Sequence, residues 1–351
     1  MRTKKLTGGV KPAARMYYLD YLRIISTFFV VFLHVSASKI LEVPIASNAW
    51  LVFVGYDSFS RFVVPMFAMI SGALFLNPDR TVKIKNLYLK NILRIATAYI
   101  VWSVSYAIYY NRQWGTDAVV KAAIKGHYHM WFLLMLIGVY AIVPILRKIV
   151  EDKKTLRYYL VIAGVFTFVL PLVMKIANSP TFSEAYGKMN FHFTIGYSAY
   201  FVLGYFLAST DFTKLGKWIC YILGVLGLAA IFALTVYSSV KTGLNDLSWW
   251  DNFSPFIMLM SVALFVFAKY EMSKIKVGKV FGKIVSELSK CSFGVYLFHA
   301  YVLERVGFYG LNVLSFNAVL SVPAIALFVF AVSFVISFAI NKIPFISKYL
   351  V

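Results

Sequence analysis

Ten long apolar runs divide this sequence, and they constrain its fold more than any other feature. Each contains a window of roughly 17 to 25 residues, the length that an α-helix needs to cross a bilayer. The runs centre near Phe28, Val63, Val101, Ile137, Phe166, Phe201, Leu228, Leu259, Phe298 and Val329. The pattern predicts an all-α polytopic integral membrane protein with about ten transmembrane helices.

The composition agrees with a membrane protein. Of the 351 residues, 61% are hydrophobic and only 14% are charged, which lies outside the range of ordinary soluble domains. The net charge of +21 is also typical of nucleic-acid binders, but here the basic residues form short clusters between apolar runs. The charge therefore indicates topology. We expect membrane lipids around the chain and no nucleic-acid partner.

The distribution of lysine and arginine predicts the orientation. Of the 35 basic residues, 25 lie in alternate segments between the runs, and such segments face the cytosol under the positive-inside rule. Both termini should then be cytoplasmic. The first run has no signal-peptide cleavage site, and no linker is long enough for a second globular domain, so residues 1–351 are predicted to form a single membrane-embedded domain.

The first run, YYLDYLRIISTFFVVFLHVSA, contains two ionisable residues, Arg23 and His34. Eleven helical steps turn close to three full turns, so the two side chains share one face and lie about 16 Å apart along the axis. Ionisable residues are costly inside a membrane, and two on one stripe suggest a polar pathway. Arg23 lies on the predicted cytosolic side, where a guanidinium suits phosphate, and His34 lies further out, where it can exchange protons.

Simpler interpretations of these residues remain open. Arg23 can extend to the inner headgroups while His34 sits in a helix interface. Asp20 lies three residues before Arg23, and the two can form an ion pair.

Further polar residues lie in the second and third runs. Asp57 and Arg61 are four residues apart, and we favour an internal ion pair between them. Their run is longer than a span needs and contains a proline, so it is expected to tilt or kink. Ser71 and Gly72 favour close helix packing over ligand contact. Arg94 opens the third run, where phosphate binding and a topological role are equally plausible.

The remaining candidates lie toward the predicted outer side. His129 precedes the fourth run, and His299, followed by Glu304, lies in the ninth. The sequence has no HExxH motif, CxxC pair, phosphate-binding loop or GxSxG motif, and its five histidines lack metal-ligand spacing, so no metal site is predicted. Cys220 and Cys291 follow basic segments expected in the cytosol, which argues against a disulfide.

Several segments together resemble the acyltransferase 3 family of bacterial membrane acyltransferases. LDYLRIISTFFVVFLH resembles the family's opening, an arginine and a histidine separated by ten residues. The other similar segments follow in the family's order along nearly the whole chain: VPMFAMISGALF, KNILRIATAYIVW, HMWFLLMLIGVYAIVPIL and SFGVYLFHAYVL.

The resemblance implies a multi-pass protein of the bacterial cytoplasmic membrane that moves an acyl group, most often acetyl from acetyl-CoA, to a hydroxyl of a carbohydrate or glycolipid outside the cytosol. It implies that His34 is catalytic, that Arg23 binds the donor and that Arg94 is a second donor-side residue. Acyl-CoA would be a co-substrate, with no permanently bound cofactor.

The chain departs from the family in two places. One is that Lys90 and Asn91 precede Arg94 where adjacent arginines are common. The other applies only to those relatives that append an esterase-like domain: the chain ends at Val351, so any such further transfer step would need a separate extracytoplasmic protein or would not occur. A transporter or exporter of a glycan or lipid-linked intermediate is the alternative function. The sequence leaves the acceptor, the oligomeric state and the choice between direct transfer and an acyl-histidine relay open.

Overall fold

The computed structural model describes residues 15–178, 184, 186–187 and 196–350, and these residues form a helical bundle without strands. The longer helices are α1 (Tyr17–Ala37), α2 (Asn48–Ser60), α3 (Val63–Phe75), α5 (Leu93–Asn111), α6 (Thr116–Lys125), α7 (Trp131–Ala141), α8 (Val143–Glu151), α9 (Lys153–Ala163), α10 (Leu170–Ala177), α12 (Gly196–Ser209), α13 (Lys214–Thr242), α14 (Pro255–Tyr270), α15 (Lys279–Phe308) and α16 (Ala318–Asn341). Short helical segments are η1 (Ile40–Glu42), α4 (Ile84–Asn86), η2 (Leu87–Ile92), η3 (Arg112–Trp114), η4 (Gly164–Val169), η6 (Ser248–Trp250), η7 (Met272–Lys274) and α17 (Pro344–Tyr349).

The helices confirm the predicted class of fold. Each of the ten predicted centres falls within a helical segment or at its first residue. Among the described residues, seven helices are long and apolar enough to span a membrane, and α7 with α8 gives an eighth if this pair, bent by 53°, is one span. By that criterion α12 and α15 are not spans.

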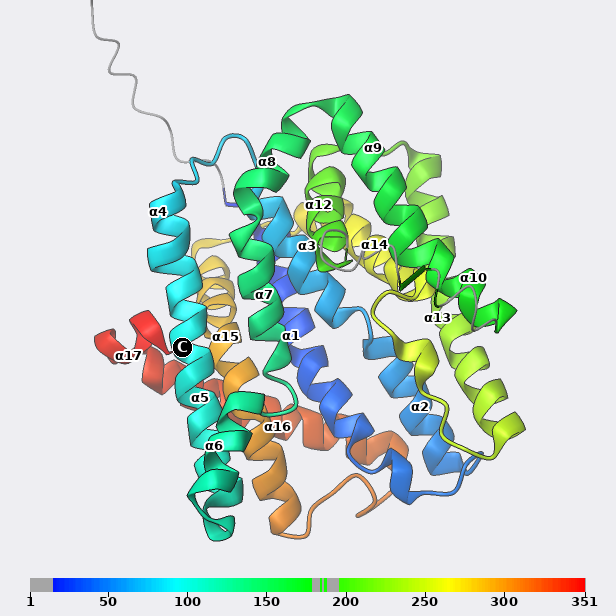
Figure 1. Cartoon of the computed structure of the whole chain (residues 1–351), viewed down its shortest axis with the longest axis vertical. Coiled ribbons are helices and arrows are strands. Elements are labelled where there is room, and N and C mark those ends of the chain that lie inside the picture. Colours follow the sequence, from blue (N-terminus) through cyan, green and yellow to red (C-terminus); the bar gives the residue numbers. More distant parts are fainter. Residues whose placement is uncertain (1–14, 179–183, 185, 188–195, 351) are drawn as a thin grey trace, which may run out of the picture.

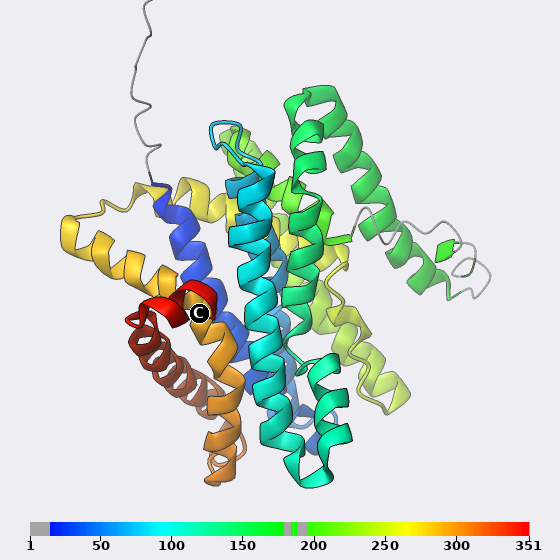
Figure 2. The same ribbon diagram turned by 60° about the vertical axis from the view of Figure 1, so that its left-hand side comes forward.

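The bundle has two distinct ends. In Figure 1 the basic turn between α8 and α9 and the start of the α4–α5 helix lie at one end, whereas α6 and the segment after α1 lie at the other. Figure 2 shows the same division after rotation. Since α1 begins toward the first end and runs to the second, we call these the Arg23 end and the His34 end.

The second apolar run is broken, as predicted. Its helices α2 and α3 are separated by Arg61 and Phe62, just before Pro65. Proline cannot donate a helical hydrogen bond, and it disfavours helical geometry in the residue before it.

A second proline shows how the bundle satisfies backbone groups. Pro323 lies inside α16 and cannot donate to the carbonyl of Val319. The hydroxyl of Tyr56, on α2, donates to that carbonyl at 2.9 Å. A neighbouring helix thus replaces the missing bond, as the membrane interior requires.

The closest helix packing joins α3 to α12. A β-carbon at Gly72 would lie 1.7 Å from the carbonyl oxygen of Phe201, and one at Gly204 would lie 2.1 Å from that of Met69. Only glycine fits at both positions, because backbone atoms form the opposing surface. The predicted packing role of Gly72 is therefore confirmed.

We expect Gly204→Ala to lower the stability of the folded protein by about 1 to 3 kcal/mol, because the methyl group would push two backbones apart. Thermal unfolding of the detergent-solubilised protein measures this. Gly138→Ala on α7 is the control, since a β-carbon there meets nothing within 4 Å. Equal stability of the two variants would contradict the proposed packing.

Candidate active site

Helices α1 and α15 lie side by side and meet at two levels. At the Arg23 end, Nη1 of Arg23 donates to Oγ of Ser289 at 2.9 Å. Toward the His34 end, the ring of His34 stacks on that of His299, with centroids 5.1 Å apart and planes at 23°. Both predicted residues therefore face the same neighbouring helix, as their spacing in the sequence predicts.

Asp20 organises the polar groups around Arg23. Its Oδ2 accepts from Nε of Arg15 at 2.7 Å, and its Oδ1 accepts from Oγ of Ser289 at 2.7 Å and lies 3.5 Å from Nη1 of Arg23. The suggested ion pair of Asp20 with Arg23 is thus present. One carboxylate serves two arginines, so this level keeps a net positive charge.

Two more arginines lie within electrostatic range of Tyr140, on α7, as Arg23 does. The hydroxyl of Tyr140 interacts electrostatically with Arg23, Arg80 and Arg94. These four residues are called the arginine cluster below. Sequence reasoning found Arg23 and Arg94 but counted Arg80 only as a loop charge, and it gave Tyr140 no role.

Aromatic rings support the arginine cluster. The guanidinium of Arg80 lies 4.9 Å from the ring centre of Phe75, whose ring lies 4.7 Å from that of Tyr140. The guanidinium of Arg94 lies 5.6 Å from the ring of Phe293. Ser71, a predicted supporting residue, places its hydroxyl 3.5 Å from that of Tyr140. The arginines are thus held by stacking as well as by charge.

Four histidines gather toward the His34 end. The ring centre of His129 lies 5.1 Å from that of His299 and 5.0 Å from that of His127, and the ring of His299 stacks on that of His34. We call these residues the histidine cluster. The fifth histidine, His192, lies outside the described residues. Within the described residues, no group of three or more His, Cys, Asp or Glu side chains is arranged to hold a metal ion.

Hydrogen bonds indicate which nitrogens of the histidine cluster carry protons. Nδ1 of His299 lies 2.6 Å from the carbonyl oxygen of Tyr296, which can only accept, so Nδ1 is the donor. In a neutral ring Nε2 is then an acceptor. Nε2 of His299 and Nε2 of His129 are both buried without a hydrogen-bond partner among the described residues.

His127 connects the histidine cluster to Glu304. Its Nδ1 lies 2.9 Å from Nδ1 of His129, and its Nε2 lies 3.6 Å from Oε1 of Glu304. His127 belongs to the segment between α6 and α7, outside the membrane-spanning segments, and burial lowers its pKa to about 4. It is therefore neutral at physiological pH. Sequence reasoning did not include His127 among the candidate residues.

His34 is only partly buried, and it lines two cavities. The inner cavity has a volume of about 130 Å³ and is also lined by Arg61, His129 and Tyr296. The outer cavity has a volume of about 460 Å³ and is lined by both polar and apolar residues from several segments. Because His34 lines both cavities, it can contact a small group in the inner cavity and a larger molecule in the outer cavity.

Arg61 is fixed in the wall of the inner cavity by the predicted ion pair. Its guanidinium binds Oδ1 of Asp57, which is completely buried, and it lies 4.3 Å from the ring centre of Trp250. The ion pair is thus confirmed. A positive charge is held beside His34 in a site that is small and largely closed.

A family model described as an acyltransferase domain matches residues 16–342. The chain belongs to the acyltransferase 3 family. The match begins one residue before α1 and ends one residue after α16, so it includes every residue of both clusters. No curated protein and no solved structure matches the chain.

Membership makes the protein a membrane acyltransferase, and its geometry suits group transfer. Acyl transfer needs a base close to the reacting carbonyl and a positive group where negative charge develops. His34 and Arg61 line one cavity and can supply these two functions.

We expect Asp57→Ala to lower the free energy of unfolding of this acyltransferase by about 3 to 5 kcal/mol, because Arg61 would keep its charge without its partner. The double variant Asp57→Ala with Arg61→Ala should lose less than the sum of the single losses. Unfolding of the detergent-solubilised protein measures the coupling. The exposed pair Lys39–Glu42 is the control and should show little coupling. Additive losses at Asp57 and Arg61 would argue against the pair.

Proposed function

We propose that this acyltransferase moves an acetyl group from acetyl-CoA in the cytosol to a hydroxyl of a carbohydrate or glycolipid on the opposite side of a bacterial cytoplasmic membrane. The observation that carries the proposal is the alignment of Arg23 and His34 along α15, with an arginine cluster at one level and a histidine cluster at the other. We place the Arg23 end in the cytosol, because the basic turn between α8 and α9 and the start of the α4–α5 helix lie there. The cytoplasmic placement of both termini stays a prediction from the sequence.

The arginine cluster suits the phosphates of coenzyme A. Guanidinium groups bind phosphate oxygens through paired, charge-assisted hydrogen bonds. Arg23, Arg80 and Arg94 come from three different segments and all interact electrostatically with Tyr140, so together they offer positive charge to a multiply charged ligand. A donor held there would direct its extended pantetheine arm along α1 toward His34, about 16 Å further along the axis.

The inner cavity suits a short acyl group. Its volume of about 130 Å³ corresponds to about four water molecules at ~30 Å³ each, enough for an acetyl group and an attacking oxygen. A long acyl chain would exceed this space. Size therefore supports acetyl as the transferred group.

His34 and Arg61 would share the chemistry. In direct transfer, His34 removes the proton of the acceptor hydroxyl, the oxygen attacks the thioester carbonyl, and the developing oxyanion is stabilised by Arg61. The carbon–sulfur bond then breaks, and His34 returns its proton to the leaving thiolate. In a relay, the imidazole itself takes the acetyl group, releases coenzyme A and then yields the acetyl group to the acceptor.

The outer cavity suits a sugar acceptor. Lys39, Glu304 and Asn312 provide donors and acceptors for hydroxyl groups, and Tyr128 provides an aromatic face. The ring of Tyr128 lies 5.1 Å from that of His34, so an acceptor bound there would lie beside the base.

Release of coenzyme A tests the proposed function directly. Purified protein in detergent, given acetyl-CoA, should release free thiol and transfer or hydrolyse the acetyl group, since the thioester is already activated. A thiol reagent measures the release. Absence of release with both sugar and glycolipid acceptors present would contradict the proposal.

We expect His34→Ala to reduce acetyl transfer by about 10²- to 10⁴-fold and to leave acetyl-CoA affinity and thermal stability nearly unchanged, because the base is lost while the donor site stays intact. Transfer, binding and unfolding should be measured on the same preparation. His127→Ala is the control within the cluster and should retain more activity. Transfer by His34→Ala near the wild-type rate would rule out this role for His34.

We expect Arg23→Ala to weaken acetyl-CoA binding about ten- to a hundredfold, because a charge-assisted phosphate contact contributes roughly 1.5 to 3 kcal/mol. Arg23→Lys should restore only part of the affinity, since the paired donors of the guanidinium are lost. Calorimetry measures the affinity. The control is Lys85→Ala, which removes an exposed charge from α4. Equal acetyl-CoA affinities for Arg23→Ala and this control would show that Arg23 has a structural role and does not bind the donor.

A further inference from the structure

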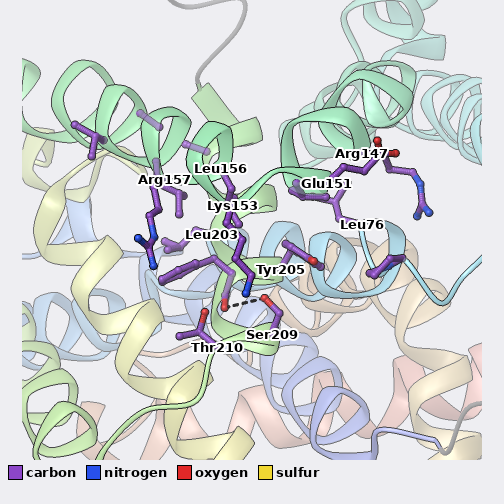
Figure 3. A pocket seen from close by; sticks show the side chains of 18 of the residues that line it. Leu76, Arg147, Glu151, Lys153, Leu156, Arg157, Leu203, Tyr205, Ser209 and Thr210 are labelled. Atoms are coloured by element: carbon purple, nitrogen blue, oxygen red, sulfur yellow. Dashed lines mark hydrogen bonds between the residues drawn. The ribbon is translucent and has the colours of Figure 1, made fainter.

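A large cavity opens at the Arg23 end, apart from both clusters. It has a volume of about 1250 Å³ and lies among α8, α9, η4 and α12, with the end of α3 and one residue of α14. None of the residues of the arginine or histidine cluster lines it. Figure 3 shows its lining side chains, and we call it the α9 pocket.

The α9 pocket has a polar part and an apolar part. Polar residues, Lys153, Arg157, Ser209 and Thr210, lie where α9 begins and α12 ends. The rest of the lining is mostly apolar and includes Leu156, Leu160, Phe168, Leu203 and Met258. One ligand that fills such a pocket must carry a polar group at one end and a hydrocarbon at the other.

The polar part of the α9 pocket has a surplus of positive charge. Within the described part of the chain, neither Lys153 nor Arg157 forms an ion pair. Glu151, the only acid in the lining, is bound by Lys148 at 2.9 Å. Figure 3 shows the side chains of Lys153 and Arg157 extending in the same direction, toward Ser209 and Thr210.

Arg147 also lines the α9 pocket, but its side chain is already bound to backbone carbonyl groups. Its Nη1 donates to the carbonyl oxygens of Phe75 at 2.6 Å and Asn77 at 3.1 Å, which fixes it against the end of α3. Figure 3 shows it on the far side of the pocket from Arg157. The two available cations are therefore Lys153 and Arg157, four residues apart on one face of α9.

The apolar wall extends into the membrane. Lys153 and Phe168 lie 15 residues apart in the continuous span Lys153–Ala177, which corresponds to about 22 Å along the helix. Figure 2 shows this green segment diverging from α7 below the turn. The wall is long enough for much of a lipid chain, and the two cations lie in the first turns of this span, where the headgroups of a bilayer crossed by it would be.

We propose that the α9 pocket binds a lipid with a phosphate in its headgroup. The phosphate would contact Lys153 and Arg157, with the hydroxyls of Ser209 and Thr210 as further donors, and one hydrocarbon chain would follow the wall formed by α9, η4 and α12. A neutral headgroup would leave the two cations without a counter-charge. This site is separate from the proposed acetyl transfer and does not depend on it.

Binding of fluorescent phosphatidylglycerol to the delipidated full-length protein in detergent tests the site. The double variant Lys153→Gln with Arg157→Gln should bind about 30-fold more weakly, because each cation near an anionic headgroup contributes about fivefold in affinity. The matched control, Lys85→Gln with Lys154→Gln, also removes two exposed charges at the Arg23 end but none from the lining or from the partner of a lining residue. It should bind like wild type.

The apolar wall is tested separately. Leu203→Trp should fill part of the pocket and weaken binding of phosphatidylglycerol, whereas Leu226→Trp on the exposed face of α13 should not. Thermal unfolding shows whether each variant is folded. If Leu203→Trp is not folded, Leu203→Phe replaces it. Equal binding by Leu203→Trp and Leu226→Trp would contradict a chain in the pocket.

Three further outcomes would overturn the proposal. Equal affinity of the double variant and its control for phosphatidylglycerol would show that Lys153 and Arg157 do not contact the phosphate. Equal affinity for phosphatidylcholine and phosphatidylglycerol of the same chains would mean that negative charge is not recognised. Competition by soluble glycerol phosphate or by coenzyme A as strong as that by unlabelled phosphatidylglycerol would assign the pocket to a soluble phosphate or to the acyl donor.

Discussion

The contact between α1 and α15 is the interaction on which the arrangement of the site depends. Polar and ionisable groups inside a membrane must find partners within the protein, because lipid offers none. Ser289 donates to Asp20 and accepts from Arg23 at one level, and His299 stacks on His34 at the other. These two contacts fix the rotation of α1 about its axis, and that rotation decides which groups face the interior.

The relation between Arg23 and His34 could be predicted from the sequence because helix geometry alone determines it. The same holds for the Asp57–Arg61 pair, whose members are one turn apart at the end of α2, and for Gly72, where small size indicates close packing. Features that lie within one helix, or at its surface, are the ones that a single sequence can reveal.

The histidine cluster could not be predicted in the same way. His129 precedes α7 and His299 belongs to α15, so their meeting depends on how distant helices pack. Arg80 lies between α3 and α4 and was attributed to topology, since every basic loop residue has the same appearance in the sequence.

The segments that line the outer cavity have a consequence for how the protein can diversify. Lys39 follows α1 and Asn312 follows α15, so these residues lie in connections and not in the packed bundle. Connections tolerate substitution, insertion and deletion better than packed helices do. In the proposed mechanism, changes there would give new acceptor preferences while the catalytic and donor-binding groups stay in place. One bundle could thus serve different cell surfaces by exchange of short loops.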